Sequence, residues 1–129
     1  MREENQEKCK IEVDVETQYI PEQSTPEQNR YVFAYTITIR NTGTVAARLL
    51  TRHWVITDSN YKVQEVRGEG VVGEQPYLRP GEGFQYTSGA MLETPVGTMA
   101  GSYAMVSDDG IDFDAKIPTF ILSTPRTLH

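Results

Sequence analysis

The sequence predicts an all-β fold in which two antiparallel sheets pack face to face as a β-sandwich. Three observations lead to this prediction. Apolar and polar residues alternate with a period of two along most of the chain, as in strands with one buried face. Short turn signals rich in Gly, Pro, Asn and Asp separate these segments. No segment longer than a few residues has the apolar period of a helix.

Length and composition indicate one domain, residues 1–129, with a flexible N-terminal segment at 1–9 and a C-terminal tail at 123–129. The net charge is −6, which argues against a nucleic-acid partner, since binding to phosphates needs basic residues. The acidic residues concentrate at the start, where residues 1–29 contain eight Asp or Glu and three Lys or Arg. Cys9 is the only cysteine, so no intrachain disulfide is possible.

The first residues are polar and unlike a signal peptide. No apolar run approaches the ~20 residues that a membrane span needs. We therefore expect a soluble cytoplasmic protein with no membrane insertion.

The first half of the chain contains three expected strands. Residues 11–19 alternate apolar side chains with an acidic outer face, and residues 30–40 place large apolar residues on every second position. Residues 48–57 are apolar on both faces, which indicates a central strand. Turns are expected at 41–44 and 58–60. The residues expected to be largely buried are Tyr35, Ile37, Ile39, Leu50 and Trp54.

The second half contains shorter expected strands at 61–66, 84–88, 98–107 and 113–122. Turns are expected at 79–83, 93–97 and 108–110. Pro118 interrupts the last strand and, because proline cannot donate a ladder hydrogen bond, marks a sheet edge or a bulge.

Residues 68–73 spell G-x-G-x-x-G, with glycines at Gly68, Gly70 and Gly73. This motif binds dinucleotide phosphates where a strand enters it and a helix follows. Pro76 and Pro80 come too soon for such a helix. The glycines then either allow tight turns with positive φ or form an anion nest of backbone N–H groups without a helix. Both interpretations remain open.

Asp108, Asp109, Asp112 and Asp114 form the densest acidic cluster. Four carboxylates near one hairpin could bind Mg²⁺ or Co²⁺ weakly, although Asp and Gly also suit a turn for geometric reasons alone. The only imidazoles are His53 and His129. We interpret His53 as a packed or hydrogen-bonded strand residue rather than as a catalytic base. No residue set has the spacing of a zinc site.

Several separate motifs resemble those of the bacterial ApaG family, in the same order over residues 10–129. They are F-A-Y-T-I-T-I at 33–39, R-H-W-V-I-T-D at 52–58, G-E-G-V-V-G-E-Q-P at 68–76, L-R-P-G at 78–81, F-Q-Y-T-S-G at 84–89, and G-S-Y with a following Met at 101–105.

The resemblance implies a fibronectin type III- or immunoglobulin-like sandwich of two antiparallel sheets. It also implies an association with cobalt and magnesium resistance or efflux, and a gene neighbourhood with a diadenosine tetraphosphate hydrolase. Related eukaryotic domains, in an F-box protein and in a DNA polymerase δ-interacting protein, look like interaction modules. The family provides no catalytic residues that could be transferred to this sequence.

Together these observations predict a non-enzymatic binding module with no required cofactor and a protein partner. Tyr61 and Tyr77 lie near the glycine turns and are candidate contact residues, because tyrosine offers apolar area with a polar tip. An open sheet edge is a second candidate surface, and it could also pair with its own copy, so the protein is expected to be a monomer or a homodimer. The alternative function is binding of a nucleotide polyphosphate at residues 68–73.

Overall fold

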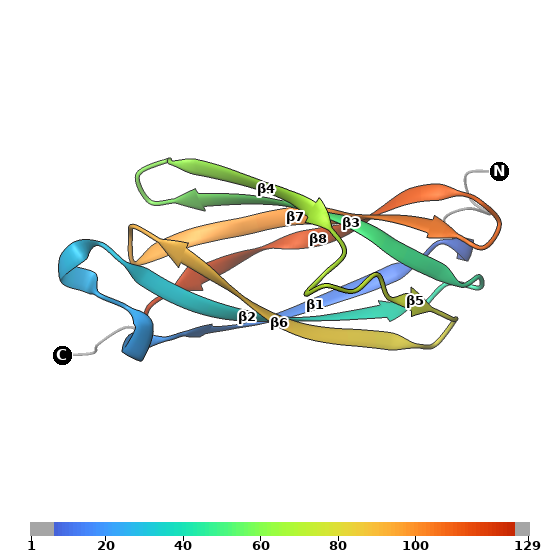
Figure 1. Ribbon diagram of the computed structural model, residues 1–129, viewed down its shortest axis with the longest axis horizontal. Coiled ribbons are helices and arrows are strands. Elements are labelled where there is room, and N and C mark those ends of the chain that lie inside the picture. Colours follow the sequence, from blue (N-terminus) through green and yellow to red (C-terminus); the bar gives the residue numbers. More distant parts are fainter. Residues whose placement is uncertain (1–6, 126–129) are drawn as a thin grey trace.

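A computed structural model describes residues 7–125 and confirms the predicted sandwich (Figure 1). One sheet has three strands in the order β1-β2-β6, and the other has five, with the path β4-β3-β7-β8 and β5 also paired to β3. All strand pairs are antiparallel. The strands are β1 (Ile11–Tyr19), β2 (Tyr31–Asn41), β3 (Ala47–Asp58), β4 (Val63–Glu69), β5 (Tyr77–Leu78), β6 (Gly83–Leu92), β7 (Val96–Ser107) and β8 (Asp112–Ser123).

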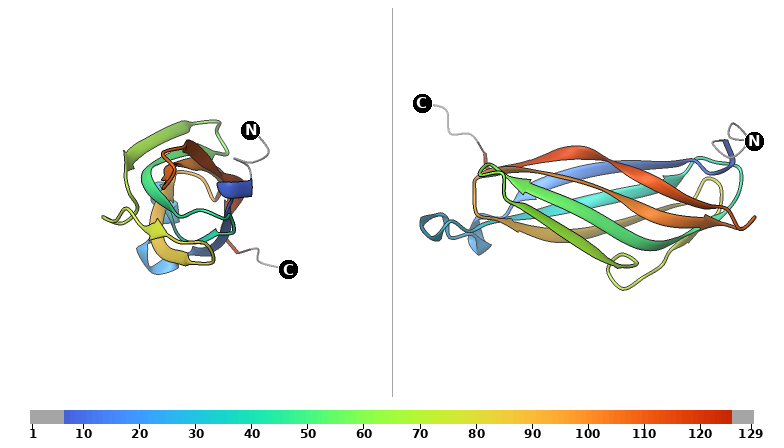
Figure 2. Two further views of the ribbon diagram at one scale, coloured as in Figure 1. Left: turned by 90° about the vertical axis from the view of Figure 1, so that its right-hand side faces the viewer. Right: turned by 90° about the horizontal axis from the view of Figure 1, so that it is seen from above.

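Two short 3₁₀ turns, η1 (Pro21–Gln23) and η2 (Pro26–Gln28), form the loop between β1 and β2. Viewed from one end, the two sheets curve around a common core (Figure 2). The predicted segment 1–9 and tail 123–129 lie partly outside the described residues. Within the described part, Ser123 completes β8, and the N–H of Thr124 donates to the carbonyl of Pro95 at 3.1 Å.

The three-stranded sheet follows the sequence pattern closely. The paired residues of β1 and β2, and of β2 and β6, keep one register without a shift. Tyr35, Ile37 and Ile39 are therefore all on the inner face and buried, as predicted. Their polar neighbours Thr36 and Thr38 lie on the other face, where each bonds to a side chain of β6.

The five-stranded sheet contains two bulges. Between β7 and β8, Pro118 lies at a register shift, in the last strand of the sheet path, so the edge and the bulge predicted from this proline are both present. Between β3 and β7, the register shifts at Leu50. The prediction that Leu50 is largely buried is wrong: Leu49 is fully buried and Leu50 is only partly buried. One extra residue reverses which positions face the core from that point on.

Other strand boundaries differ by a few residues from those expected. The strand predicted at 61–66 begins later and continues through Gly68 to Glu69, because these residues pair with Arg52 and Thr51 of β3. β3 lies between β4 and β7, which confirms that it is a central strand.

The core between the sheets is built around Trp54. Its rings lie edge-on to three aromatic side chains, with ring centroids 5.4 Å from Tyr35, 6.4 Å from Tyr103 and 5.8 Å from Phe120. Such arrangements place the positive ring edge against the negative face of the neighbour. The indole Nε1 is buried and has no hydrogen-bond partner in the described part of the chain. The position of Trp54 is therefore decided by shape and ring packing.

A polar contact crosses the same core. The hydroxyl of Tyr86 on β6 is hydrogen-bonded to that of Tyr103 on β7, so it joins the two sheets. Burial raises the pKa of Tyr86 to about 12 and also raises the pKa of Tyr103. Both phenols are neutral at physiological pH, and the hydrogen bond satisfies groups that would otherwise be costly to bury.

Trp54 fits only because the residue opposite it on β7 is Gly101. A Cβ atom at Gly101 would lie 2.1 Å from the carbonyl oxygen of His53 and 3.1 Å from Cε3 of Trp54. The backbone and the indole occupy the space that any other residue would need.

We expect Gly101→Ala to lower the free energy of unfolding by about 1–3 kcal/mol, because the added methyl group must displace β3 or the indole. Gly89→Ala is the matched control, since a Cβ there meets its nearest atom, the carbonyl oxygen of Phe33, at an ordinary 3.5 Å. Urea unfolding followed by Trp54 fluorescence measures both variants. Equal stabilities of the two variants would contradict this account of the core.

Candidate functional site

The glycine motif is a compact loop attached to the bulge of β3. The N–H of Gly70 donates to the carbonyl of Leu50 at 2.8 Å, and Gln75 Nε2 donates to the same oxygen at 2.9 Å. Val71 is fully buried and anchors the loop in the core. Arg52 Nη1 donates to the carbonyls of Glu69 and Gly70, each at 3.0 Å. The loop is therefore held by both backbone and side-chain contacts.

Two of the three glycines have positive φ, as expected if the motif serves to form tight turns. Gly70 has φ 61° and Gly73 has φ 80°, whereas Gly68 lies within β4. A Cβ at Gly70 would lie 2.3 Å from the carbonyl oxygen of Glu74. Mutual backbone hydrogen bonds between Val71 and Glu74 close a two-residue hairpin.

Val72 is the unexpected residue of this hairpin. It has φ 42° and is followed by Gly73, also at positive φ, which is the signature of a type I′ turn. Positive φ is rare for a β-branched residue. The side chain is 60% exposed, so burial of the valine does not compensate for this backbone strain.

The anion nest at Gly68, Gly70 and Gly73 remains a prediction. The N–H groups of Gly70, Val71 and Glu74 already donate to carbonyls of the chain. An open depression of about 300 Å³ beside the loop is lined by Glu69 and Glu74 as well as by glycines, and these carboxylates would repel a phosphate.

The four aspartates of the predicted cation site have different surroundings. Asp108 accepts a 2.6 Å hydrogen bond from Tyr77, and Asp109 lies 3.6 Å from the Lys8 ammonium. Asp112 and Asp114 lie on β8 with exposed side chains. Within residues 7–125, no group of three or more His, Cys, Asp or Glu side chains is placed to hold a metal ion. Weak binding of Mg²⁺ or Co²⁺ at this hairpin stays a prediction.

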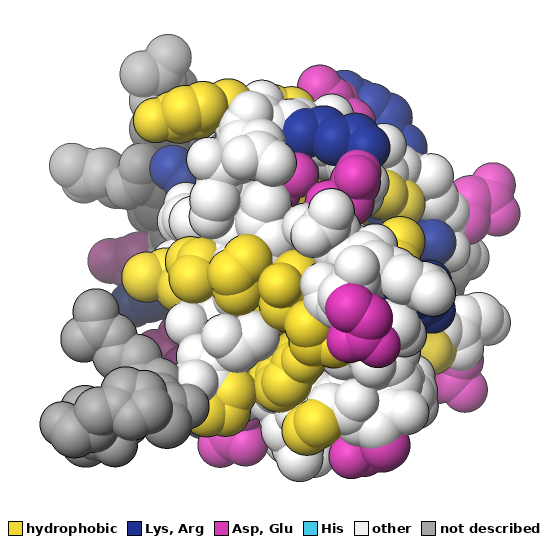
Figure 3. All heavy atoms as spheres, turned by 90° about the vertical axis from the view of Figure 1, so that its left-hand side faces the viewer, with side chains coloured by type: hydrophobic (Ala, Val, Ile, Leu, Met, Phe, Trp, Pro, Cys, Tyr) yellow, Lys and Arg dark blue, Asp and Glu magenta, His cyan; other side chains and the backbone are white. Residues whose placement is uncertain are grey.

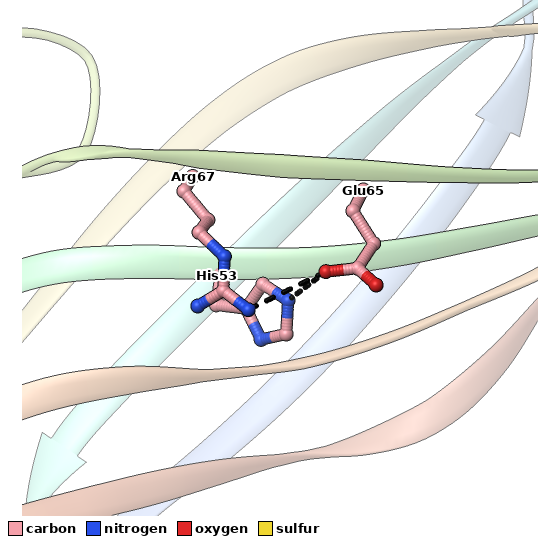
Figure 4. Close-up of polar contacts among 3 residues, drawn as sticks. All are labelled: His53, Glu65 and Arg67. Atoms are coloured by element: carbon pink, nitrogen blue, oxygen red, sulfur yellow. Dashed lines mark hydrogen bonds and ion pairs between the residues drawn. The ribbon is translucent and has the colours of Figure 1, made fainter.

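His53 lies on the outer face of the five-stranded sheet beside two charged residues of β4 (Figure 4). Its Nε2 is 3.1 Å from Oε2 of Glu65, and Arg67 Nη2 is 3.4 Å from the same oxygen. The contact with His53, supported by Arg67, lowers the pKa of Glu65. His53 is thus a hydrogen-bonded strand histidine, as interpreted from the sequence.

Tyr77 is largely occupied by contacts within the chain. Its hydroxyl donates to Asp108, which raises the pKa of Tyr77, and the Arg48 guanidinium lies 5.1 Å from its ring centroid. Tyr77 therefore links β5 to β3 and to the β7–β8 hairpin. The hydroxyl of Tyr77 is therefore engaged within the chain, while 37% of the residue stays exposed, and its role as a contact residue remains a prediction.

Tyr61, in contrast, is 87% exposed and has φ 64°. The carboxylate of Asp58 fixes the turn by accepting hydrogen bonds from the N–H groups of Asn60 and Lys62, at 2.8 and 3.0 Å. Ser59 connects this turn to the β6–β7 turn, since its N–H donates to Thr94 Oγ1 at 3.0 Å and its hydroxyl donates to the carbonyl of Val96 at 2.7 Å. The two turns form one hydrogen-bonded unit at this end of the sandwich.

Exposed apolar side chains gather at this end, where a band of them crosses the surface (Figure 3). We call the set the apolar end; it consists of Tyr61, Met91, Val96 and Ile121, which are 87, 42, 42 and 62% exposed. Tyr61, Val96 and Ile121 line an open groove of about 320 Å³. Sequence reasoning identified Tyr61 but missed the other three, because they come from separate elements and are unremarkable in their own segments.

The two candidate tyrosines are not neighbours. Tyr77 pairs with Arg48 near the start of β3, and Tyr61 follows Asp58 at its end. At ~3.3 Å per residue the two positions are about 33 Å apart, so one loop surface cannot contain both.

Replacing Val72 by Asn should raise the free energy of unfolding by about 1 kcal/mol, because Asn-Gly is the preferred pair for a type I′ turn and tolerates positive φ. Val63→Asn is the control, since Val63 is similarly exposed but lies in strand β4, where Asn is unfavourable. Chemical unfolding of both variants compares them. A loss of stability in Val72→Asn would show that the valine side chain makes a stabilising contact.

Comparison with known proteins adds two findings to this geometry. The family model described as the ApaG domain matches residues 21–107. The chain is 66% identical to the Protein ApaG of Thiobacillus denitrificans over 122 residues, which are 95% of this chain and 96% of that protein. It is 62% identical to the Protein ApaG of Dechloromonas aromatica over the same shares of the two chains.

Solved structures point to the same family. A crystal structure of a protein from Bordetella pertussis, described as ApaA, has 54% identity and a TM-score of 0.91, covering 94% of this chain and 98% of that one. A protein from Archaeoglobus fulgidus with 11% identity and a TM-score of 0.52 shares the fold alone. In the described part of the chain, no helix has the length and apolar character needed to cross a membrane. On its sequence, its match to the family model and its fold, the chain belongs to the ApaG family.

Proposed function

We propose that this protein is a non-enzymatic interaction module of the cytoplasm that binds a protein partner through the apolar end. Any link to cobalt and magnesium resistance would then act through that partner. The observation that carries the proposal is the exposure of Tyr61 and Ile121 at the rim of an open groove. Exposed apolar groups gathered around a groove are typical of binding sites.

The rigidity of this end supports the proposal. Asp58, Ser59 and Thr94 fix both turns through hydrogen bonds, so little conformational entropy remains to be lost when a partner binds. Lys62 and Glu93, the sequence neighbours of Tyr61 and Thr94 in the two turns, form an ion pair with exposed side chains. A partner segment with one apolar side chain for the groove and polar groups around it would fit this arrangement.

A non-catalytic role is supported by the engagement of the reactive side chains. His53 is paired with Glu65, Tyr77 with Asp108, and the Tyr86 and Tyr103 hydroxyls with each other. Each contact can be explained by folding alone. The competing function, binding of a nucleotide polyphosphate at residues 68–73, has the glycine pattern in its favour and the flanking carboxylates against it.

We expect no micromolar or tighter binding of diadenosine tetraphosphate, ATP or GTP, because Glu69 and Glu74 oppose a phosphate and the nearby amides are engaged. Isothermal titration calorimetry with each nucleotide tests this. Binding abolished by Gly70→Val would establish the competing function.

NMR titration with Mg²⁺ tests the predicted cation site at Asp108, Asp109, Asp112 and Asp114, where amide shifts are expected to centre on residues 109–113. If millimolar Mg²⁺ moves none of them, the predicted site is refuted.

The partner site is tested by affinity capture from the native cell. The double variant Tyr61→Ala/Ile121→Ala should reduce the recovery of specific partners about tenfold or more, since buried aromatic anchors dominate interface energies. Tyr77→Ala is the matched control, because Tyr77 lies on β5 and pairs with the start of β3, far from the apolar end. Quantitative mass spectrometry measures recovery, and circular dichroism confirms folding. Full capture by the double variant would refute the apolar end as the binding surface.

A further inference from the structure

β4 is an open edge of the five-stranded sheet. It ends the strand order next to β3, and six of its seven residues are exposed. Its sequence is V-Q-E-V-R-G-E over residues 63–69. An open edge offers unpaired N–H and C=O groups to another strand.

The direction of these groups follows from the hydrogen bonds at both ends of β4. The Gly70 N–H donates to β3 at Leu50, and the Lys62 carbonyl accepts from β3 at Asp58. In an antiparallel sheet, the N–H and C=O of one residue point to the same neighbouring strand, and those of the next residue point to the other side. The backbone groups of the even-numbered residues of β4 therefore point toward β3. The backbone groups of Val63, Glu65, Arg67 and Glu69 therefore face outward.

We propose that this edge pairs with the β4 edge of a second copy, antiparallel and centred on Val66, to form a homodimer with one continuous sheet. In this register Glu65 lies opposite Arg67 of the second copy, and Val63 lies opposite Glu69. These residues have the outward-facing backbone groups. Each of the two pairs occurs twice in the symmetric dimer, so four pairs exchange about eight backbone hydrogen bonds, alternating with non-hydrogen-bonded pairs as an antiparallel ladder requires. Val66 meets its own copy in a non-hydrogen-bonded pair.

The side chains are complementary in the same register. Glu65 and Arg67 alternate with Val66 and lie on the outer face, so the dimer contains two cross-strand pairs of opposite charge. Both side chains are more than half exposed, at 55 and 72%. Val66, on the opposite face and 38% exposed, would be covered by the valine of the second copy.

Charge also distinguishes this edge from the others. β4 contains Arg67 against Glu65 and Glu69, so it carries both signs of charge and a net charge of only −1 in a chain of net charge −6. Self-pairing of β1 would bring together the acidic side chains of its outer face, and β8 is interrupted by the bulge at Pro118. β6 has no charged residue that could select a register. A second copy is thus the occupant that fits β4.

The first test is sedimentation velocity over a range of protein concentrations. The wild-type protein should show a reversible monomer–dimer equilibrium, and Arg67→Glu should raise the dimer dissociation constant about tenfold or more, because two attractive pairs become repulsive. The exchange variant Glu65→Arg/Arg67→Glu restores opposite charges and should return the constant to near the wild-type value. A wild-type protein that stays monomeric at millimolar concentration overturns the proposal, and so does an exchange variant no tighter than Arg67→Glu.

The second test fixes the register and does not depend on affinity. In a Cys9→Ser background, Val66→Cys should form an intermolecular disulfide under mild oxidation, since opposed residues of a non-hydrogen-bonded pair have Cα atoms about 4.5 Å apart. Gln64→Cys, on the same face but about 13 Å from its copy in this register, should not. Equal cross-linking at both positions, or none at position 66, overturns the register. The apolar end is unchanged in all these variants, so the partner-binding proposal is tested separately.

Discussion

The sandwich depends on how Trp54 fits between its two sheets. The indole needs the space that Gly101 leaves on the neighbouring strand, and its edges are packed by Tyr35 from the opposite sheet and by Tyr103 and Phe120 from its own. Because Nε1 makes no hydrogen bond in the described part of the chain, only close packing holds the ring. The Tyr86–Tyr103 contact then adds a directional link between the sheets.

The position of Trp54 is in turn connected to the glycine loop. The bulge at Leu50 sets the parity of β3, so that Leu49 and Trp54, which differ in parity, both face the core. The carbonyl of the bulged residue Leu50 accepts hydrogen bonds from the Gly70 N–H and from Gln75 Nε2, so the loop continues the β3–β4 ladder. The motif that resembles a phosphate-binding fingerprint therefore completes the hydrogen bonding of a central strand, and buried Val71 fixes the loop in place.

The two surfaces proposed for binding lie on the outside of the sandwich. At one end, the turns at Asp58 and Thr94 hold Tyr61 and its apolar neighbours toward solvent. Along one side, β4 exposes backbone groups flanked by Glu65 and Arg67. These surfaces are separate: the apolar end suits a different protein, and the self-complementary edge suits a second copy. A dimer formed through β4 would place the two apolar ends at opposite ends of the paired strands, so that one assembly could bind two partners.

The sequence by itself determined the fold class, the core of the three-stranded sheet and the presence of an edge or a bulge at Pro118. Alternation over residues 31–41 specifies which side chains are buried because this sheet has no bulge, and Pro118 cannot donate to a ladder anywhere. Family membership could also be inferred, since many motifs recur in order.

Only the tertiary structure decided the inner face of β3 and the candidate surfaces. A bulge is a single residue whose presence depends on the partner strand, so Leu50 and Leu49 could not be distinguished in advance. Tyr61 and Tyr77 are close in sequence but lie at opposite ends of β3, whereas Tyr61, Val96 and Ile121 are distant in sequence and share one groove. Which residues meet at a surface depends on strand order and register, and a local pattern contains neither.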